Sequence, residues 1–406
     1  MFKSPKAYRT FLTVLFTYAL DLVGFSIVFP VLAPLLLNPN LAYFSPDATE
    51  ALRTTVLGLL FAFFGIAQFF GSPVAGVLAD HYGRYKVFLS SIGLSIVGYA
   101  IMAFSVYWQS LGWMFAGRIL TGFCSGNFSL AQSATADLTD AKHRSKAFGY
   151  LLGVGSVGFI AGPWVGGKLA NPEWLFGSGA FIFAAIAALV NFVMVLFFFS
   201  ETFTRKHAEM KLFETFKDLR YVYHEKSLRT ILTAFLLFST GWAFYLVFFP
   251  TYLVQRFGLV ADRIGDIYAY QAVLWAFVSM FLNKELVGKF SLRALILAGL
   301  FLAAVGVALN VYPDELWPYW IVIPIAITGA ATCWVNVGTL LSTSASEHMQ
   351  GRALGASGAM WSIGQIISPL AAGPLAAWNI YSPLLVGSVC IFIAFAYFVL
   401  CYRGKE

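Results

Sequence analysis

Two charged residues lie inside stretches of the sequence that are otherwise apolar. Asp21 interrupts "LDLVGFSIVFPVL", and Arg118 begins "RILTGFCSGN". If the first helix begins near residue 8, a rise of 1.5 Å per residue places Asp21 roughly 20 Å along its axis, near the middle of a bilayer. Arg118 lies about 15 Å from the opposite end of its own predicted helix by the same rise. Charges at this depth are costly when they face lipid, so we expect the two groups to face each other or a wet cavity.

A carboxylate in such a place can take up and release a proton under the control of a nearby guanidinium. Protonation of Asp21 would end its attraction to Arg118 and favour a different arrangement of the surrounding helices. The alternative is a permanent structural ion pair that never titrates. A second acid, Asp266, lies near the outer end of a later apolar stretch and is a weaker candidate for carrying a proton.

The elements that must position these charges are membrane helices. Of the 406 residues, 59% are hydrophobic and 11% are charged, whereas a soluble domain has about 25% charged residues. Apolar runs of about 18 or more residues recur, and each can cross a hydrocarbon core of about 30 Å as a helix. The predicted spans are 8–36, 54–79, 86–105, 108–135, 143–170, 176–200, 229–256, 263–289, 292–311, 317–345, 350–378 and 381–402.

The basic residues indicate how the chain is oriented in the membrane. A net charge of +7 could suggest a nucleic-acid partner, but with a cytoplasmic N-terminus most of the 26 Lys and Arg residues fall on the cytoplasmic side. The predicted outer segments hold only Arg53, Lys168, Arg256 and Arg263. This asymmetry predicts that both termini are cytoplasmic and that nucleic acid is not a partner. The first apolar stretch is too long for a signal peptide and has no small-residue cleavage site, so we expect it to remain as a span.

The predicted spans form two groups of six, separated by the hydrophilic segment 201–229. That segment is expected to be either an amphipathic helix on the membrane surface or a solvated tether. A shift of 206 residues places Gly149, Gly158 and Pro163 on Gly355, Gly364 and Pro369, so the halves resemble copies of each other. We therefore predict an all-α integral membrane protein with twelve transmembrane helices in two pseudo-symmetric six-helix bundles. The predicted parts are 1–200, the linker 201–229, and 230–406, with a binding site near the midplane between the bundles.

The sequence "GVLADHYGRYK" forms the predicted cytoplasmic turn between the second and third spans. Gly76 and Gly83 allow a close helix approach and a sharp turn. Asp80 would be stabilised at the N-terminus of a neighbouring helix, and Arg84 can bridge to that acid. The pattern resembles the loop signature of the major facilitator superfamily. The resemblance implies that Asp80, Arg84 and Lys86 form a cytoplasmic latch that holds the outward-facing state, whereas an ordinary positive-inside loop is the simpler alternative.

The fifth predicted span contains "GFIAGPWVGG". It resembles the Gly-Pro-x-x-Gly-Gly signature of the exporting, antiporter branches of that superfamily. A smooth glycine face permits tight packing against another helix, and a proline bends the helix that carries it. Close helix packing without any role in antiport is the alternative. The residues of this motif are Gly158, Gly162, Pro163, Gly166 and Gly167.

The resemblance is closest to tetracycline/proton antiporters and related drug:proton antiporters, and it extends over almost the whole chain. "GIAQFFGSPVAGVLADHYGR" and "ADLTDAKHRSKAFG" are similar to their equivalents at family spacing, and Asp21 and Arg118 match family positions. One departure concerns the third and ninth spans, where those antiporters have further acids. Here "SIVGYAIMAF" and "ALILAGLFLAAVGVAL" have none, which argues against a tetracycline–metal complex as substrate.

Amide and aromatic side chains at middle depths of the spans are candidates for lining a substrate cavity. Such groups hold an amphipathic ligand by stacking and hydrogen bonding, although most aromatic residues in a chain of this kind face lipid. The cavity candidates are Gln68, Trp242, Tyr245, Gln271 and Gln365, with Trp275 and Trp361 as further aromatic residues.

The sequence contains no pattern that predicts an enzyme. The histidines fall in loops, the cysteines form no C-x-x-C pair, and no Walker-type phosphate loop is present. No metal or cofactor is expected. The predicted function is proton-coupled efflux of an amphipathic small molecule by alternating access. Two alternatives remain. One is uptake or facilitated exchange of a metabolite, with Asp21 and Arg118 as a substrate clamp, and the other is a non-transporting membrane sensor or scaffold. The expected partners are the small molecule, protons and the lipid bilayer, the expected state is a monomer, and the resemblance implies a bacterial inner (plasma) membrane.

Overall fold

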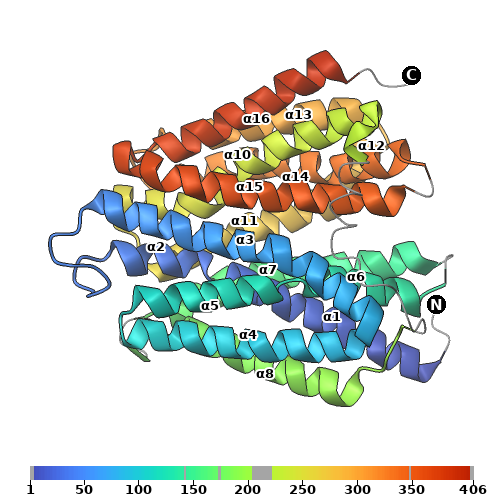
Figure 1. The fold of residues 1–406 in the computed structure, drawn as a ribbon. Coiled ribbons are helices and arrows are strands. Elements are labelled where there is room, and N and C mark those ends of the chain that lie inside the picture. The colour runs from blue at the N-terminus through green and yellow to red at the C-terminus, as the bar shows by residue number, and fades with distance from the viewer. Residues whose placement is uncertain (1–3, 141–142, 172–174, 204–221, 347–348, 403–406) are drawn as a thin grey trace. The chain divides into compact units, whose positions relative to one another are not determined.

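The computed structural model describes residues 4–140, 143–171, 175–203, 222–346 and 349–402, which form an assembly of long helices (Figure 1). The first half contains α1 (Pro5–Ser26), α2 (Phe29–Leu37), α3 (Glu50–Tyr82), α4 (Arg84–Tyr107), α5 (Leu111–Cys124), α6 (Asn127–Leu138), α7 (Arg144–Leu169), the 3₁₀ turn η2 (Leu175–Gly177) and α8 (Gly179–Phe198). The second half contains α10 (Lys226–Phe257), α11 (Ala261–Phe277), the π-helical turn η3 (Val278–Leu282), α12 (Asn283–Val287), α13 (Leu292–Leu309), α14 (Tyr319–Ser344), α15 (Gln350–Trp378) and α16 (Ser382–Cys401).

These helices confirm the predicted fold class. Within the described ranges, ten helices are long and apolar enough to cross a membrane, with α1 and α2 counted together as Pro5–Leu37. The two remaining predicted spans are also helical, since α5 and α6 cover most of 108–135 and α15 covers 350–378. The chain is therefore a multi-pass, all-α membrane protein whose helices occupy the twelve predicted ranges.

Two of the spans are interrupted, and each interruption has a local cause. The first breaks after Ser26, because the ring of Pro30 cannot follow an unbroken helix and has no N–H to donate. The fourth breaks after Cys124, where the backbone N–H of Ser125 donates to the carbonyl of Gly122 at 3.1 Å and ends the helix. The second break matters for the candidate site, because it places Asn127 at the start of a new helix.

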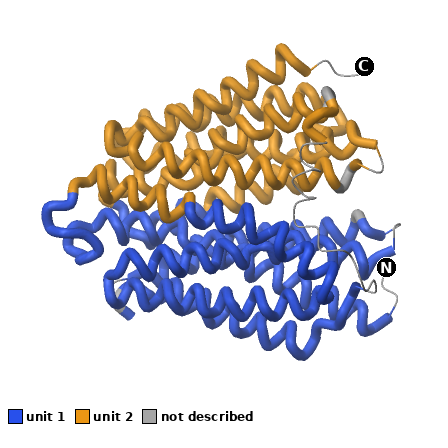
Figure 2. The backbone as a smooth tube through the Cα atoms, viewed as in Figure 1, with its two compact units in different colours: residues 1–48, 63–212, 259–269 blue, residues 49–62, 213–258, 270–406 orange. Residues whose placement is uncertain are grey.

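The described helices group into two compact units, which Figure 2 colours separately. Unit 1 comprises 1–48, 63–212 and 259–269, and unit 2 comprises 49–62, 213–258 and 270–406. In unit 1, α1 packs against α6, α7 and α8, while α4 packs against α5 and α8. The unit 1 core includes the buried side chains of Phe11, Val14, Phe88, Leu130 and Val195.

In unit 2, α10 packs against α15 and α16, and α13 packs against α14 and α16. Small residues allow α13 and α14 to approach closely: a Cβ added to Gly299 would lie 2.7 Å from the backbone nitrogen of Cys333. The predicted division into 1–200, 201–229 and 230–406 remains a prediction. Most of the linker that was expected to be amphipathic lies outside the described residues.

Candidate functional site

Asp21 lies on α1 and has one hydrogen-bonding partner in the described structure. Its Oδ1 atom accepts a hydrogen bond from Nδ2 of Asn127, at a distance of 3.4 Å. Its Oδ2 atom is buried and has no partner among the described residues. A carboxylate with one satisfied and one unsatisfied oxygen has a free position for a proton. Asn127 is the first residue of α6, so the break in the fourth span brings this amide to Asp21.

Two tyrosines complete the polar surroundings of Asp21. Tyr18, one turn earlier on α1, and Tyr99 on α4 both interact electrostatically with the carboxylate. The hydroxyl of Tyr99 lies directly against Gly24, where a Cβ would collide with it. Gly24 therefore leaves the room that Tyr99 needs to reach the Asp21 region.

Arg118 is on α5, and its side chain is buried, with a relative exposure of 3% for the residue. Its guanidinium carbon lies 4.2 Å from the centroid of the Phe64 ring on α3, which is a cation–π geometry. The ion pairs among the described residues do not include one between Arg118 and Asp21, so of the two expected arrangements, a direct pair or a shared wet cavity, the structure does not contain the direct pair. Tyr99 interacts electrostatically with both charges and is their common neighbour.

Asp21 and Arg118 were identifiable from the sequence, but the residues that surround them were not. Asn127 and Tyr99 lie in apolar spans without any motif of their own. The available signal in the sequence was the polar amide of Asn127 directly after "CSG", at the position where the fourth span breaks between α5 and α6. Cys124, at the end of α5, also interacts electrostatically with Asp21, and its carbonyl accepts a hydrogen bond from Oγ of Ser91 at 2.7 Å.

The turn between α3 and α4 is held by a carboxylate that no sequence motif indicated, that of Glu201. Gly83 has φ of 94°, which only glycine adopts without strain. Directly after it, the backbone N–H groups of Arg84 and Tyr85 donate to the two oxygens of Glu201, at 3.0 and 3.2 Å. Glu201 thereby places its negative charge at the N-terminus of α4, where the helix dipole stabilises it.

The predicted bridge from Arg84 to Asp80 also needs correction. Nε of Arg84 pairs with Oδ2 of Asp137 on α6 at 2.7 Å, while Asp80 and Lys86 are exposed. Glu201 occupies the helix N-terminus that Asp80 was expected to occupy. Oγ1 of Thr202 also donates to Asp137, at 3.4 Å.

Gly76, the remaining residue of the predicted latch, does not mediate a close helix approach. A Cβ built on it would meet no atom within 4 Å. The expectation that Gly76 allows two helices to approach closely is therefore wrong. The structure brings Arg84 to Asp137 and Glu201, and leaves Gly76 facing open space.

The glycine motif of α7 packs against α1. A Cβ on Gly158 would collide with the carbonyl of Ala19, and one on Gly162 would lie 2.7 Å from the carbonyl oxygen of Val23. A Cβ on Gly166 would likewise lie 2.5 Å from the carbonyl oxygen of Ile27. This contact covers the part of α1 that includes Asp21, so a shift of α7 cannot leave that part of α1 undisturbed.

The end of α7 makes a second set of contacts, with α11. A Cβ on Gly167 would lie 2.6 Å from the carbonyl oxygen of Ala261. Nζ of Lys168 pairs with Oδ1 of Asp262 at 2.5 Å and with Oδ1 of Asp266 at 3.2 Å. Asp266 therefore lies within reach of a cationic partner on α7.

The cavity candidates fall in different parts of the fold. Trp242, Tyr245, Gln271 and Gln365 belong to unit 2, and all four are buried. The rings of Trp242 and Tyr245 are 5.1 Å apart. Gln68 is half-buried in unit 1, on α3.

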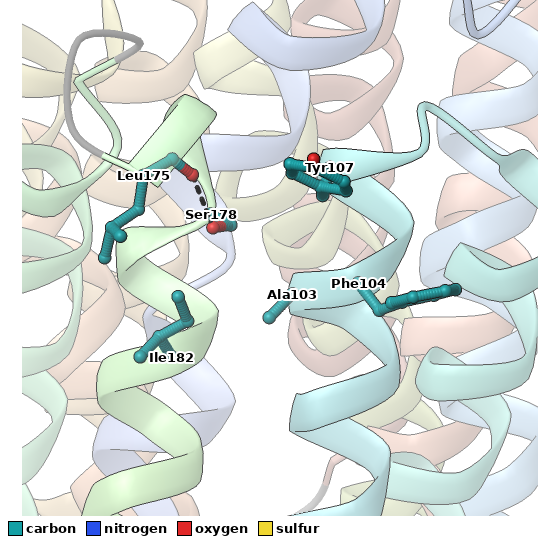
Figure 3. Close-up of a pocket in the computed structure, with 6 residues that line it drawn as sticks. All are labelled: Ala103, Phe104, Tyr107, Leu175, Ser178 and Ile182. Atoms are coloured by element: carbon teal, nitrogen blue, oxygen red, sulfur yellow. Dashed lines mark hydrogen bonds between the residues drawn. The ribbon is translucent and has the colours of Figure 1, made fainter.

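A cavity of about 350 Å³ lies elsewhere, between α4 and the start of α8 (Figure 3). Ser178 is the N-cap of α8, and its Oγ donates to the carbonyl of Leu175. This cavity contains none of the predicted site residues, and it offers no acid or base. Its lining residues are Ala103, Phe104, Tyr107, Leu175, Ser178 and Ile182. Within the described part of the chain, no group of three His, Cys, Asp or Glu residues could hold a metal ion.

Comparisons with known proteins place this geometry in a family. The chain is 28% identical over 367 residues to the class H tetracycline resistance protein of Pasteurella multocida, covering 89% of this chain and 88% of that protein. It is 27% identical over 353 residues to multidrug resistance protein 2 of Bacillus subtilis (strain 168), covering 82% and 83%.

Solved structures show the same fold. The human organic anion transporter MFSD10 (TETRAN) superposes with a TM-score of 0.71 at 19% identity, covering 97% of this chain and all of that one. A D-xylose–proton symporter superposes with a TM-score of 0.74 at 16% identity, covering 97% and 98%. Residues 14–369 match the family model described as Major Facilitator Superfamily. The chain therefore belongs to the major facilitator superfamily, whose members are transporters and not enzymes.

Proposed function

We propose that this protein exports an amphipathic small molecule in exchange for protons, by alternating access, and that Asp21 carries the proton. The observation that carries the proposal is the buried Oδ2 atom of Asp21, which has no hydrogen-bonding partner among the described residues. The names of the relatives, which include tetracycline and multidrug resistance proteins, support export as the direction.

The exchange begins with a change of charge on α1. When Asp21 is ionised, Oδ1 accepts the hydrogen bond from Asn127. A proton on Oδ2 removes the negative charge that Tyr18 and Tyr99 experience. Tyr99 lies near both Asp21 and Arg118, and we propose that it transmits the change to the α5 guanidinium.

Helix α7 connects this charge change to the rest of the transporter. Its glycine face packs on α1 beside Asp21, and its end is bound to α11 through Lys168. An altered α1 therefore favours an altered position of α7, and with it a different contact to α11. We propose that the bonds of Lys168 to Asp262 and Asp266 close the predicted outer side.

The contacts at the α3–α4 turn are proposed to act on the predicted cytoplasmic side. The Arg84–Asp137 pair and the Glu201 cap fix the start of α4 against α6 and the segment after α8. We propose that this cluster, with Asp80, Lys86 and Gly76 around it, is the latch that stabilises one of the two alternating states.

The same proposal includes the state and location of the protein. The protein is a monomer with two six-helix bundles, 1–200 and 230–406, it lies in the bacterial plasma membrane, and both of its termini are in the cytoplasm. The absence of acids in the sequence of the third and ninth spans supports an organic molecule and not a metal chelate as substrate.

Flux in proteoliposomes tests the proposal. The purified protein is reconstituted, a pH gradient is imposed, and movement of a panel of fluorescent amphipathic dyes is followed. The proposal predicts gradient-driven accumulation that Asp21→Asn abolishes and that Asp47→Asn, at an exposed acid of the α2–α3 loop, leaves intact. Flux that ignores the gradient and survives Asp21→Asn supports facilitated exchange instead, and no flux for any dye supports the sensor.

A further inference from the structure

We propose that unit 2 contains the recognition surface for the transported molecule, and that this surface selects a flat, conjugated ligand with hydrogen-bond acceptors. The proposal rests on the proposed transport function and specifies its substrate class. The surface consists of three hydrogen-bond donors, Tyr245, Gln271 and Gln365, and four tryptophans, Trp242, Trp275, Trp334 and Trp361.

The three donors are buried and have no partner. The relative exposures of Tyr245, Gln271 and Gln365 are 0%, 4% and 7%. The hydroxyl of Tyr245 and the Nε2 atoms of both glutamines lack any hydrogen-bonding partner within the described structure. Unit 2 also contains buried hydroxyls without a partner among the described residues, at Thr251, Ser279 and Ser368. Buried polar groups are nearly always satisfied in folded proteins, so this set of unsatisfied donors points to a partner that binds in unit 2.

Each donor shares a helix face with a tryptophan. Gln271 is four residues before Trp275 on α11, and Gln365 is four residues after Trp361 on α15. Tyr245 is three residues after Trp242 on α10. Residues three or four apart lie on the same side of a helix, so each of the three helices presents one ring and one donor together.

The tryptophans form a continuous aromatic row. The ring centroids of Trp242 and Trp275 are 5.7 Å apart, those of Trp275 and Trp334 are 6.2 Å apart, and those of Trp334 and Trp361 are 5.0 Å apart. Trp242 is buried, whereas the other three are partly exposed. Partly exposed rings have faces free for a further ring to stack on. Trp334, near the middle of the row, was not identified from the sequence.

Glycines next to these rings leave room for a ligand. A Cβ added to Gly338 or Gly358 would meet no atom within 4 Å. Gly338 is four residues after Trp334 on α14, and Gly358 is three residues before Trp361 on α15, so both lie on the faces that carry the rings. The space is local, because a Cβ on Gly364 of the same helix would lie 2.9 Å from the backbone nitrogen of Thr240.

The chemistry of these groups defines the ligand. Two amide N–H donors and one phenol O–H select carbonyl oxygens, ether oxygens or ring nitrogens. The aromatic row selects a flat ring system. None of the seven side chains is charged, so recognition depends on the ligand's acceptors and shape.

Matched probes test the selection in the full-length protein reconstituted in nanodiscs. 9-Fluorenone and fluorene share one flat frame, and only fluorenone has a carbonyl acceptor. Binding is followed by tryptophan fluorescence, with empty nanodiscs subtracted. We expect fluorenone to bind about tenfold more tightly than fluorene, and Gln365→Met to lower fluorenone affinity about five- to tenfold while fluorene affinity stays the same. Tyr245→Phe, which removes only a hydroxyl, provides the same comparison with minimal risk to folding.

Tryptophan variants test the stacking surface. Trp334→Ala is expected to lower the affinity for both probes about tenfold. Trp320→Ala, at an exposed position of the same helix α14, is expected to change the affinity for neither probe. Equal wild-type affinities for the two probes, or fluorenone affinity unchanged in both Gln365→Met and Tyr245→Phe, would overturn the proposal. Binding is measured without a pH gradient, so the binding result does not depend on whether flux is coupled to protons. In the same way, a lack of selective binding would not change the result of the flux assay.

Discussion

Lys168 on α7 forms an ion pair with Asp262 on α11, with 2.5 Å between Nζ and Oδ1. The same ammonium group reaches Asp266 at 3.2 Å. Since α7 also packs its glycines on α1 beside Asp21, one helix contacts both the candidate proton site and this ion pair. The relationship gives the proposed transport cycle a physical connection that can be tested at each end.

Lys168→Met removes the ammonium and leaves Asp262 and Asp266 one turn apart on α11 without their cation. We expect the start of α11 to open more often, because its attraction to α7 is lost and two like charges one turn apart destabilise the first turns of the helix. Amide hydrogen exchange of peptides from Ala261–Ala269 should accelerate about two- to fivefold. Arg256→Met is the matched control, because it removes another exposed ion pair, with Asp314, within unit 2. Unchanged exchange in Lys168→Met would show that the pair does not hold the helices together.

Gly83→Ala should destabilise the protein at the α3–α4 turn. The residue has φ of 94°, and its added Cβ would collide with the Glu201 carboxylate that caps α4. The combined strain and lost cap amount to about 1–3 kcal/mol, which a lower midpoint of thermal unfolding in detergent would report. Gly153→Ala is the control, because its Cβ would meet no atom within 4 Å. Equal midpoints for the two variants would refute this account of the turn.

The Arg84–Asp137 pair should show strong coupling in a double-mutant cycle. Arg84 is buried, so Asp137→Asn leaves a cation without its anion and should cost about 3 kcal/mol in the free energy of unfolding. Arg84→Met combined with Asp137→Asn should cost less than the sum of the single changes. Additive effects would mean that the 2.7 Å contact contributes nothing specific. Asp80→Asn, at the exposed acid of the same turn, should change stability by less than about 0.5 kcal/mol.

Asn127→Leu should move the pH dependence of flux. The amide donates to the ionised carboxylate of Asp21, so its loss favours the protonated form. The pH profile of transport is expected to shift towards alkaline pH by about one unit. Thr17→Val removes another buried hydrogen bond of α1, to Asn191 at 2.8 Å, and should lower activity or stability without moving the profile. A profile that Asn127→Leu leaves in place would remove Asn127 from the proton site.

Much of the fold was predictable from the sequence, because hydrophobic length alone defines membrane helices. The glycines of α7 also indicated a close helix approach that the structure contains, whereas the break before Pro30 was not predicted. Contacts between side chains were less predictable. The sequence placed Asp21 and Arg118 at similar depths, but depth along an axis does not fix which helix faces meet.

The corrections share one physical cause. The break after Cys124 placed Asn127 beside Asp21, and the chain after α8 placed Glu201 at the α4 N-terminus. Both depend on where distant segments pack, which spacing within a motif does not report. Trp334 was missed for the same reason, since only its contacts with Trp275 and Trp361 distinguish it from lipid-facing aromatics.

The protonation of Asp21 itself is the central claim, and infrared difference spectroscopy of the reconstituted protein measures it directly. Spectra recorded across about pH 5 to 9 should contain a protonated-carboxyl band that disappears as the pH rises, and Asp21→Asn should remove that band. Adding a transported dye at fixed pH should change the same band, because export requires the proton to leave. A carboxylate of Asp21 that stays ionised over the whole range, with or without dye, would contradict the account.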